Sequence, residues 1–469
     1  MENINSGEKP KCCCQKKGFW WAVAIVAILG LGAFFFLKGI HRPTSATNQN
    51  GVAPTGQAPS ITILWAQWAP SDYLVKLSED FTKETGIKVN VQQESWSDFQ
   101  NVFFNEMSKK GDAFDIVIGD SQWMGRGATE GHYIELTNWP QGKNIIETMT
   151  PASVAGYSEY PSGSGHYWGI PFEGDAMGFA YRKDLFEDPK EKEDFKKKYK
   201  RELKVPATTT ELRDIAEFFY RPQKDFFGII IWNNKDYDGV TMGIESFIWA
   251  FGGDLGDKKT YKVKGILNTS AAEAGLNYYK EIYQFSSPLW KNAYLDTNKG
   301  MMEGKVAMVM SYFAFFPELL DESKNPYAKS MGFFANPAGP KMRVSSLGGQ
   351  GASVIAYSKK KDLSLQFLEW FAKEEVQQKW GKLGGYTCNK NVLNSADFLN
   401  AMPFNRPLME SMGMMKDFWA IPEYSKLLKV SQENFYKFMT EKNYSAKQAL
   451  NETADQWETT FEEAGYYKE

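Results

Sequence analysis

The sequence predicts an α/β fold of two lobes that follows one transmembrane helix. Three observations support this prediction. The chain has 469 residues, which is too many for one hydrophobic core of ordinary size. From residue 60 onward, short apolar runs alternate with amphipathic helical segments, as they do in doubly wound α/β sheets. An uncharged apolar run at residues 19–37 precedes this alternation.

The composition is that of a soluble globular protein, with 43% hydrophobic and 24% charged residues, and it predicts an ordered core. The formal net charge of −3 gives no bulk attraction to nucleic acid, so we expect no nucleic-acid partner. Aromatic residues reach 15% of the chain. Most should lie in the core, and a minority on loops would suit a pocket that binds the flat face of a ligand.

The run 19–37 is long enough to anchor the chain in a membrane. As a helix it spans about 28 Å, close to the roughly 30 Å hydrocarbon core of a bilayer. The lysines before it favour a cytoplasmic segment 1–18 and an extracytoplasmic binding domain. The alternative is a signal peptide cleaved near Ala46, but its apolar region is usually only about 7–15 residues. Residues 38–59 are polar and rich in Pro and Gly, which predicts a flexible tether.

The cysteines and histidines predict neither an internal disulfide nor a metal site. Residues 12–14 are cysteines before the apolar run, and Cys388 lies beyond it. A membrane between them would leave Cys388 without a partner on its side. The chain has 3 histidines and no cluster with the spacing of metal ligands.

Apolar periodicity predicts the main elements in chain order. Strands are expected at 61–65, 87–92, 115–119, 227–232 and 305–310, and extended runs at 168–172, 177–181 and 354–357. Helices are expected at 71–85, 96–110, 209–220, 271–285 and 363–382, a solvated charged segment at 186–204, and helix from Met402 to the end.

Sequence motifs for catalysis are absent. The run Gly119-Asp120-Ser121 lacks the flanking glycines of a hydrolase nucleophile elbow. The glycine-rich run 348–351 matches neither a dinucleotide-binding loop nor a phosphate-binding loop. We therefore expect no enzyme activity, no catalytic residues and no cofactor.

Aromatic and acidic residues recur where predicted strands end. Ligands of open α/β sheets bind beyond the carboxyl ends of the strands, so this placement predicts a binding site. Carboxylates accept hydrogen bonds from vicinal hydroxyls, and rings cover the apolar faces of a sugar. The candidates are Trp65, Trp68, Asp120, Glu173, Asp175, Trp232 and Tyr312.

Several segments, taken in order, resemble the family 1 extracellular solute-binding proteins. They are ITILWAQW, FTKETGIKVNV, FDIVIGDSQWMGRGATEGHYIELTNW, YWGIPFEGDAMGFAYRKDLFED, MMEGKVAMVMSYFAFF and SLGGQGASVIAYSKKKDLSLQFLEWFA. The resemblance covers nearly all of residues 61–467. It implies a two-lobed, periplasmic-binding-protein-like (type II) fold with hinge-crossing strands and a solute held in the cleft.

The resemblance also implies lobe boundaries and residue roles. The first lobe would comprise 60–173 and 345–395, and the second 174–344 and 396–469. Asp175 stands where the family's sugar-binding acid lies, and Trp419, in a segment expected to be helical, stands where a stacking ring lies. Gln350 is an amide candidate. Ser311-Tyr312-Phe313 departs from the family's Gly-Pro-Trp type of sequence at that place.

These features together predict the anchored, monomeric binding component of an ABC importer, with a carbohydrate as solute and permease subunits as partners. Three alternatives stay open at this point. Acidic residues with rings also suit a cationic solute such as a polyamine. An anchored ligand sensor or docking module would use the same fold, although about eighteen residues before the membrane are too few for a signalling domain. The third alternative is that the protein is an enzyme.

Overall fold

The computed structural model describes residues 58–236, 238–290 and 297–467. The chain divides into two compact units, 1–56 and 57–469, and all described residues belong to the second. The expected membrane helix 19–37, the cysteines at 12–14 and nearly all of the tether lie outside the described residues. Among the residues that are described, no helix is long and apolar enough to cross a membrane.

Within the described residues, nine strands form a mixed sheet whose central path is β2-β1-β3-β8-β4-β6-β5, with β7 on β4 and β9 on β8. The strands are β1 (Ser60–Ala66), β2 (Lys88–Glu94), β3 (Ile116–Asp120), β4 (Ile170–Arg182), β5 (Phe227–Ile230), β6 (Val306–Tyr312), β7 (Met331–Ala335), β8 (Ser345–Val354) and β9 (Met415–Lys416). The α/β class expected from the alternating pattern is confirmed.

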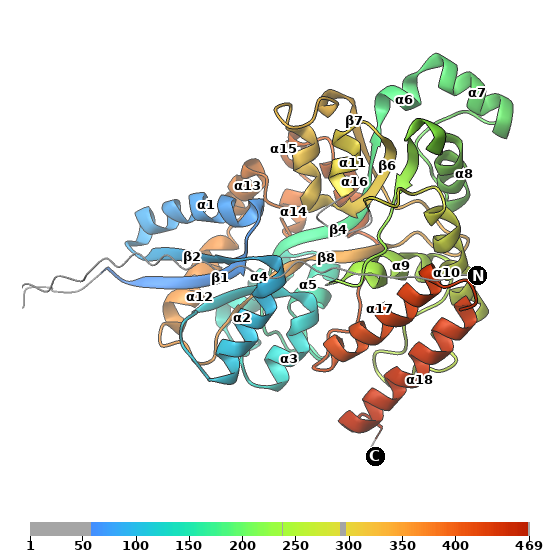
Figure 1. Ribbon diagram of the computed structural model, residues 1–469. Coiled ribbons are helices and arrows are strands. Elements are labelled where there is room, and N and C mark those ends of the chain that lie inside the picture. Colours follow the sequence, from blue (N-terminus) through green and yellow to red (C-terminus); the bar gives the residue numbers. More distant parts are fainter. Residues whose placement is uncertain (1–57, 237, 291–296, 468–469) are drawn as a thin grey trace, which may run out of the picture. The chain divides into compact units, whose positions relative to one another are not determined.

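Strands β4 and β8 join the two halves of this sheet (Figure 1). The first half of β4 pairs antiparallel with β8, and its second half pairs with β6 and β7. Strand β8 in turn pairs with β3. The two extended runs expected at 168–172 and 177–181 are therefore one continuous strand. The strand expected at 354–357 is mostly wrong, because β8 ends at Val354 and begins at Ser345.

The first half of the sheet carries β1, β2 and β3, which pair in parallel. Its core is covered by α1 (Ala69–Thr85), α2 (Trp96–Ser108), α12 (Lys361–Phe371) and α13 (Glu374–Leu383). Gly86 ends α1 in the left-handed conformation, at φ 75°, as expected of a glycine after a helix. The single helix expected at 363–382 is wrong: the break near Lys373 lets Trp380 of α13 turn onto Phe172 and Phe371.

The second half is packed by α8 (Thr209–Phe219), α9 (Gly239–Ala250), α10 (Ser270–Tyr283), α17 (Tyr424–Thr440) and α18 (Ala446–Ala464). Thr208 caps α8 through a capping box with Glu211, which satisfies backbone donors in the first turn of the helix. In the charged segment, α7 (Pro189–Tyr199) buries only Phe195, which confirms a solvated surface helix.

The remaining helices are short and connect these layers. They are α3 (Met124–Thr129), α4 (Pro140–Thr148), α5 (Pro151–Tyr157), α6 (Lys183–Glu187), α11 (Thr297–Met302), α14 (Lys390–Leu393), α15 (Ala396–Ala401) and α16 (Asn405–Met412). Short 3₁₀ turns follow β3, at Ser121–Trp123, and β6, at Phe313–Leu320.

The expectation of unbroken helix after Met402 is wrong. Helix α16 ends at Met412, β9 then pairs with the start of β8, and residues 417–423 are not helical before α17 begins. Pro422 removes a backbone donor from this stretch, which disfavours its continuation as helix. Trp419 consequently lies in a loop and not in a helix. The predicted lobe boundaries stay a prediction, because β4 and β8 run through both halves.

Candidate functional site

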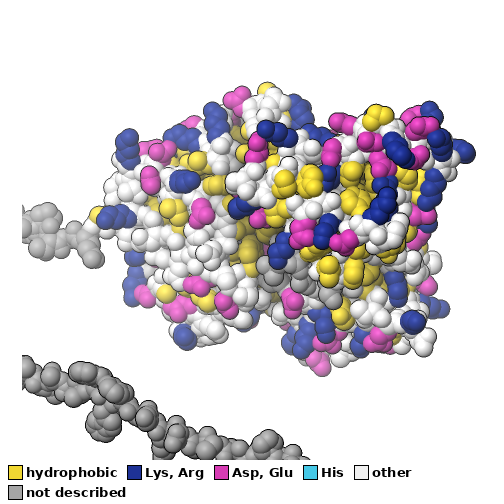
Figure 2. Space-filling model, turned by 45° about the horizontal axis from the view of Figure 1, so that its top comes forward, with side chains coloured by type: hydrophobic (Ala, Val, Ile, Leu, Met, Phe, Trp, Pro, Cys, Tyr) yellow, Lys and Arg dark blue, Asp and Glu magenta, His cyan; other side chains and the backbone are white. Residues whose placement is uncertain are grey.

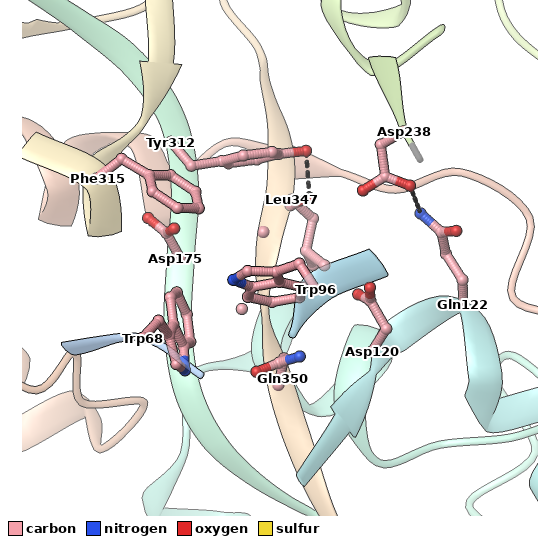
Figure 3. A pocket seen from close by; sticks show the side chains of 12 residues that line it. Trp68, Trp96, Asp120, Gln122, Asp175, Asp238, Tyr312, Phe315, Leu347 and Gln350 are labelled. Atoms are coloured by element: carbon pink, nitrogen blue, oxygen red, sulfur yellow. Dashed lines mark hydrogen bonds between the residues drawn. The ribbon is translucent and has the colours of Figure 1, made fainter. Parts of the chain in front are cut away.

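Residues from both halves of the sheet line one cavity where β4 and β8 run together, which we call the central cavity (Figure 3). Segments that follow β1, β2 and β3 supply one side, and segments that follow β5 and β6 supply the other. The described lining residues are Trp68, Trp96, Asp120, Gln122, Asp175, Asp238, Tyr312, Phe315, Leu347, Gly348, Gly349 and Gln350.

Aromatic rings form one wall of the central cavity. The centroids of Trp68 and Trp96 are 5.2 Å apart with the rings nearly perpendicular, at 84°. Phe315, from the other half of the sheet, lies 6.1 Å from Trp68. Tyr312 ends β6, and its hydroxyl donates to the Leu347 carbonyl of β8 at 3.3 Å. Such a wall offers flat apolar surface to a ligand ring.

Three carboxylates line the central cavity: Asp120 at the end of β3, Asp175 within β4 and Asp238 directly before α9. Asp175 is 2% exposed, and it accepts backbone N–H bonds from Ala176 at 2.8 Å and from Ala314 at 3.3 Å. Burial raises the pKa of Asp175 to about 8, although these backbone donors act in the opposite direction. No lysine or arginine is among the described residues that line this cavity.

Gln350 supplies an oriented amide. The indole N–H of the fully buried Trp65 donates to Gln350 Oε1, which fixes which end of the amide carries the nitrogen. Gln350 Nε2 is buried and has no hydrogen-bond partner. Figure 3 shows this nitrogen on the side of Asp120. The amide therefore presents a donor that an acceptor oxygen of a ligand could satisfy.

Direct hydrogen bonds also connect the two sides. Gln122 Nε2 donates to Asp238 Oδ1 at 3.5 Å, and Gln100 Nε2 donates to the Tyr424 hydroxyl. A cavity of about 370 Å³ shares Gln122 and Asp238 with the central cavity. We call it the adjoining cavity. It also carries the exposed side chain of Lys235.

The family described as bacterial extracellular solute-binding protein matches residues 65–378. The chain belongs to this family. The maltotriose-binding protein of Pyrococcus abyssi is 21% identical over 358 residues, which are 72% of this chain and 68% of the relative. A probable amino-acid ABC transporter periplasmic-binding protein of Sinorhizobium fredii is 21% identical over 86% of this chain and 88% of its own length.

A solved structure shares the fold of this solute-binding protein. The solute-binding protein of Agrobacterium radiobacter, in complex with ribitol, superposes with a TM-score of 0.72 at 20% identity, covering 86% of this chain and 99% of its own. The two-lobed, periplasmic-binding-protein-like fold implied by the sequence resemblance is thereby confirmed. Members of the family bind solutes and are not enzymes.

The structure brings five of the nine sequence candidates together in the central cavity of this solute-binding protein. They are Trp68, Asp120, Asp175, Tyr312 and Gln350. Their role in binding stays a prediction.

The other four candidates do not line the central cavity. Trp65 lies behind Gln350, and Trp232 is buried behind Tyr312, with ring centroids 5.6 Å apart. Trp419 packs against Trp457 and Phe461. It lines a separate cavity of about 180 Å³ beside α5, which we call the α5 cavity.

Glu173 is the fourth candidate that does not line the central cavity. Its side chain is fully buried, and neither of its carboxyl oxygens has a hydrogen-bond partner. Burial, followed by the nearby Asp175 carboxylate, raises its pKa well above the usual value. The native protein therefore keeps a proton on Glu173 at a pH where the unfolded chain, with a pKa of about 4.3, has lost it.

We expect Glu173→Gln to stabilise the protein more at pH 8 than at pH 5. Because the folded-state pKa is raised, wild-type stability is complete below pH ~4 and falls by about 1.4 kcal/mol per pH unit as pH rises toward that pKa. The neutral amide does not titrate. Denaturant unfolding at both pH values measures the difference, with the exposed Glu369→Gln as control. Parallel stabilities of wild type and Glu173→Gln at the two pH values would contradict this assignment.

Among the lining residues that sequence reasoning missed, four have polar or aromatic side chains: Trp96, Gln122, Asp238 and Phe315. Trp96 and Gln122 lie within two residues of the ends of β2 and β3, so the strand-end rule could have found them. Asp238 lies eight positions after β5, and Phe315 lies inside a 3₁₀ turn. Neither placement gives a signal in the sequence alone.

Proposed function

We propose that this protein captures a sugar or a polyol in the central cavity and delivers it to an ABC importer permease. One observation carries the proposal: both halves of the sheet supply rings, carboxylates and an oriented amide to the same cavity. Carboxylates accept hydrogen bonds from hydroxyls, the amide donates one, and rings cover apolar ring faces. Relatives described as binding maltotriose and ribitol support this class of solute.

A free amino acid fits the same cavity less well. Its α-carboxylate calls for a cationic partner or a cluster of donors, and arginine is the usual choice. The described lining holds no lysine or arginine but three carboxylates. This charge balance favours a hydroxylated solute, although one relative is described as a probable amino-acid binder.

Isothermal titration of the full-length protein in detergent micelles tests this function. The panel should hold sugars and polyols, with and without amino groups, beside free amino acids and polyamines. Saturable binding of a sugar or polyol supports the proposal. Binding of amino acids or polyamines alone would overturn it.

We further propose that residues 19–37 hold the protein, as a monomer, at the cell membrane with the binding domain on the extracytoplasmic side. The apolar length of this run and the lysines before it support the proposal. We expect the protein in the membrane pellet after a carbonate wash of cells, because a hydrophobic span resists extraction that removes peripheral proteins. Recovery of a mature N-terminus near residue 46 would show cleavage instead.

A further inference from the structure

Five acidic side chains lie in or directly behind the central cavity. Asp120, Asp175 and Asp238 line it. Glu173 and Glu245 lie behind it, each 0% exposed. All five belong to segments that meet around β4 and β8. Taking several like charges out of water together is costly unless they are protonated or meet an opposite charge.

The Tyr312 hydroxyl lies among these acidic groups. Its pKa is raised well above the usual value, first by burial and then by the negative charges of Asp238, Glu245 and Asp120. By contrast, basic and acidic side chains are interspersed on the molecular face drawn in Figure 2. Among described lining residues, lysines occur in the adjoining cavity, at Lys235 and Lys429, but not in the central one. The described lysines therefore lie beside the central cavity and not in it, where the acidic groups are gathered.

A second observation is independent of charge. Gln350 is 1% exposed, lines the central cavity and has an Nε2 without a partner. The buried Trp68 Nε1 is also without a hydrogen-bond partner. Both groups are donors that cannot accept, so each calls for an acceptor oxygen. A polyamine has no such oxygen, whereas the hydroxyls of a sugar do.

We propose that the solute is an amino sugar with a free, protonated amine, whose ammonium group lies between Asp120 and Asp238 while its hydroxyls meet Gln350 and Asp175. Asp175 lies on the opposite side of the central cavity from the other two carboxylates (Figure 3). The proposal rests on the proposed sugar-binding function and narrows its solute class. The rings of Trp68 and Phe315 suit both parts of such a ligand, because a ring face attracts a cation and also covers an apolar sugar face.

Calorimetric titration of the full-length protein with matched ligands tests the proposal. Glucosamine is compared with glucose, and the β-1,4 dimer of glucosamine with cellobiose and with the N-acetylated dimer. Galactosamine against galactose covers a second ring configuration, and spermidine serves as an amine without hydroxyls. A charge-assisted bond present only with the amine should make an amino sugar bind about tenfold to a hundredfold more tightly than its neutral or acetylated counterpart.

Substitutions test whether Asp238 is responsible for the tighter binding of amino sugars. In Asp238→Asn the ratio of amino-sugar to neutral-sugar affinity should fall about tenfold, whereas the exposed Glu369→Gln should keep the wild-type ratio. Equal affinity for amino and neutral sugars would overturn this inference and leave the proposed function standing. Tighter binding of the acetylated dimer, or no binding of any amino sugar in the set, would also overturn it. Binding of spermidine without any sugar would overturn both.

Discussion

Replacing Trp419 by alanine should lower the free energy of unfolding by about 3–5 kcal/mol, the usual cost of removing a buried tryptophan side chain. The indole is 1% exposed, and its ring centroid lies 5.0 Å from Phe461 and 6.2 Å from Trp457 of α18. Solute affinity of the folded variant should stay near wild type, because Trp419 does not line the central cavity. Denaturant unfolding and titration calorimetry measure the two quantities.

Trp419→Phe is the matched variant, since it keeps a ring against Phe461 and should recover much of the stability. The opposite pattern would contradict this placement: stability within about 1 kcal/mol of wild type together with a large loss of affinity. That result would mean that Trp419 contacts solute, as the family resemblance implied, and that the α5 cavity is the binding site.

Replacing Asp175 should weaken solute binding. Burial keeps a proton on this carboxyl near neutrality, so Asp175→Ala should lower affinity by about twofold to tenfold, because a hydrogen bond between uncharged groups contributes roughly 0.5–1.5 kcal/mol. Asp175→Asn keeps the shape of the side chain and removes its ability to ionise. For a neutral sugar the loss should be modest, and for a solute that places an ammonium group beside Asp175 it should approach that of alanine. Calorimetric titration of both variants distinguishes these cases.

Removing a buried carboxyl group also changes stability, so affinity must be measured on variants that have been shown to be folded. The Asp175 pKa of about 8 means that the native protein holds this proton near neutrality, and that both neutral replacements should be tolerated. Wild-type affinity in Asp175→Ala would contradict the assignment of this residue to the binding site.

Most of the regular elements could be predicted from sequence because their periodicity is local. The strand at β1, the helix ended by Gly86 and the capping box at Thr208 each depend on residues within one or two turns. The same holds for Asp120, which follows a continuous apolar strand. The neighbours of such residues in space are also their neighbours in sequence. The local sequence pattern is therefore enough to predict the element.

The glycine run of β8 shows why other elements could not be predicted. Glycine weakens a strand, so Gly348–Gly351 gave no strand signal. A Cβ at Gly349 would meet the Glu173 carbonyl oxygen at 2.2 Å, and one at Gly351 would meet the Tyr157 carbonyl oxygen at 2.2 Å. The small residues are needed because β4 and α5 approach this strand closely. That requirement comes from segments about 180 residues away in the sequence. The residues around the glycines therefore do not indicate it.

The direction of each side chain explains why one candidate tryptophan lines the central cavity and the others do not. Trp65 and Trp68 both follow the same apolar run, yet Trp65 is still within β1 and faces the core, whereas Trp68 lies beyond the strand at the cavity. Sequence position alone could not separate them. Asp238 was missed because the chain runs eight residues past β5 before it returns to the cavity.

A crystal structure of the protein with its tightest-binding solute tests the central claim most directly. We predict electron density for the solute in the central cavity, in contact with Trp68, Asp175 and Gln350, with segments from both halves of the sheet closed around it. Density for the solute in the α5 cavity beside Trp419, with the central cavity empty, would contradict this account.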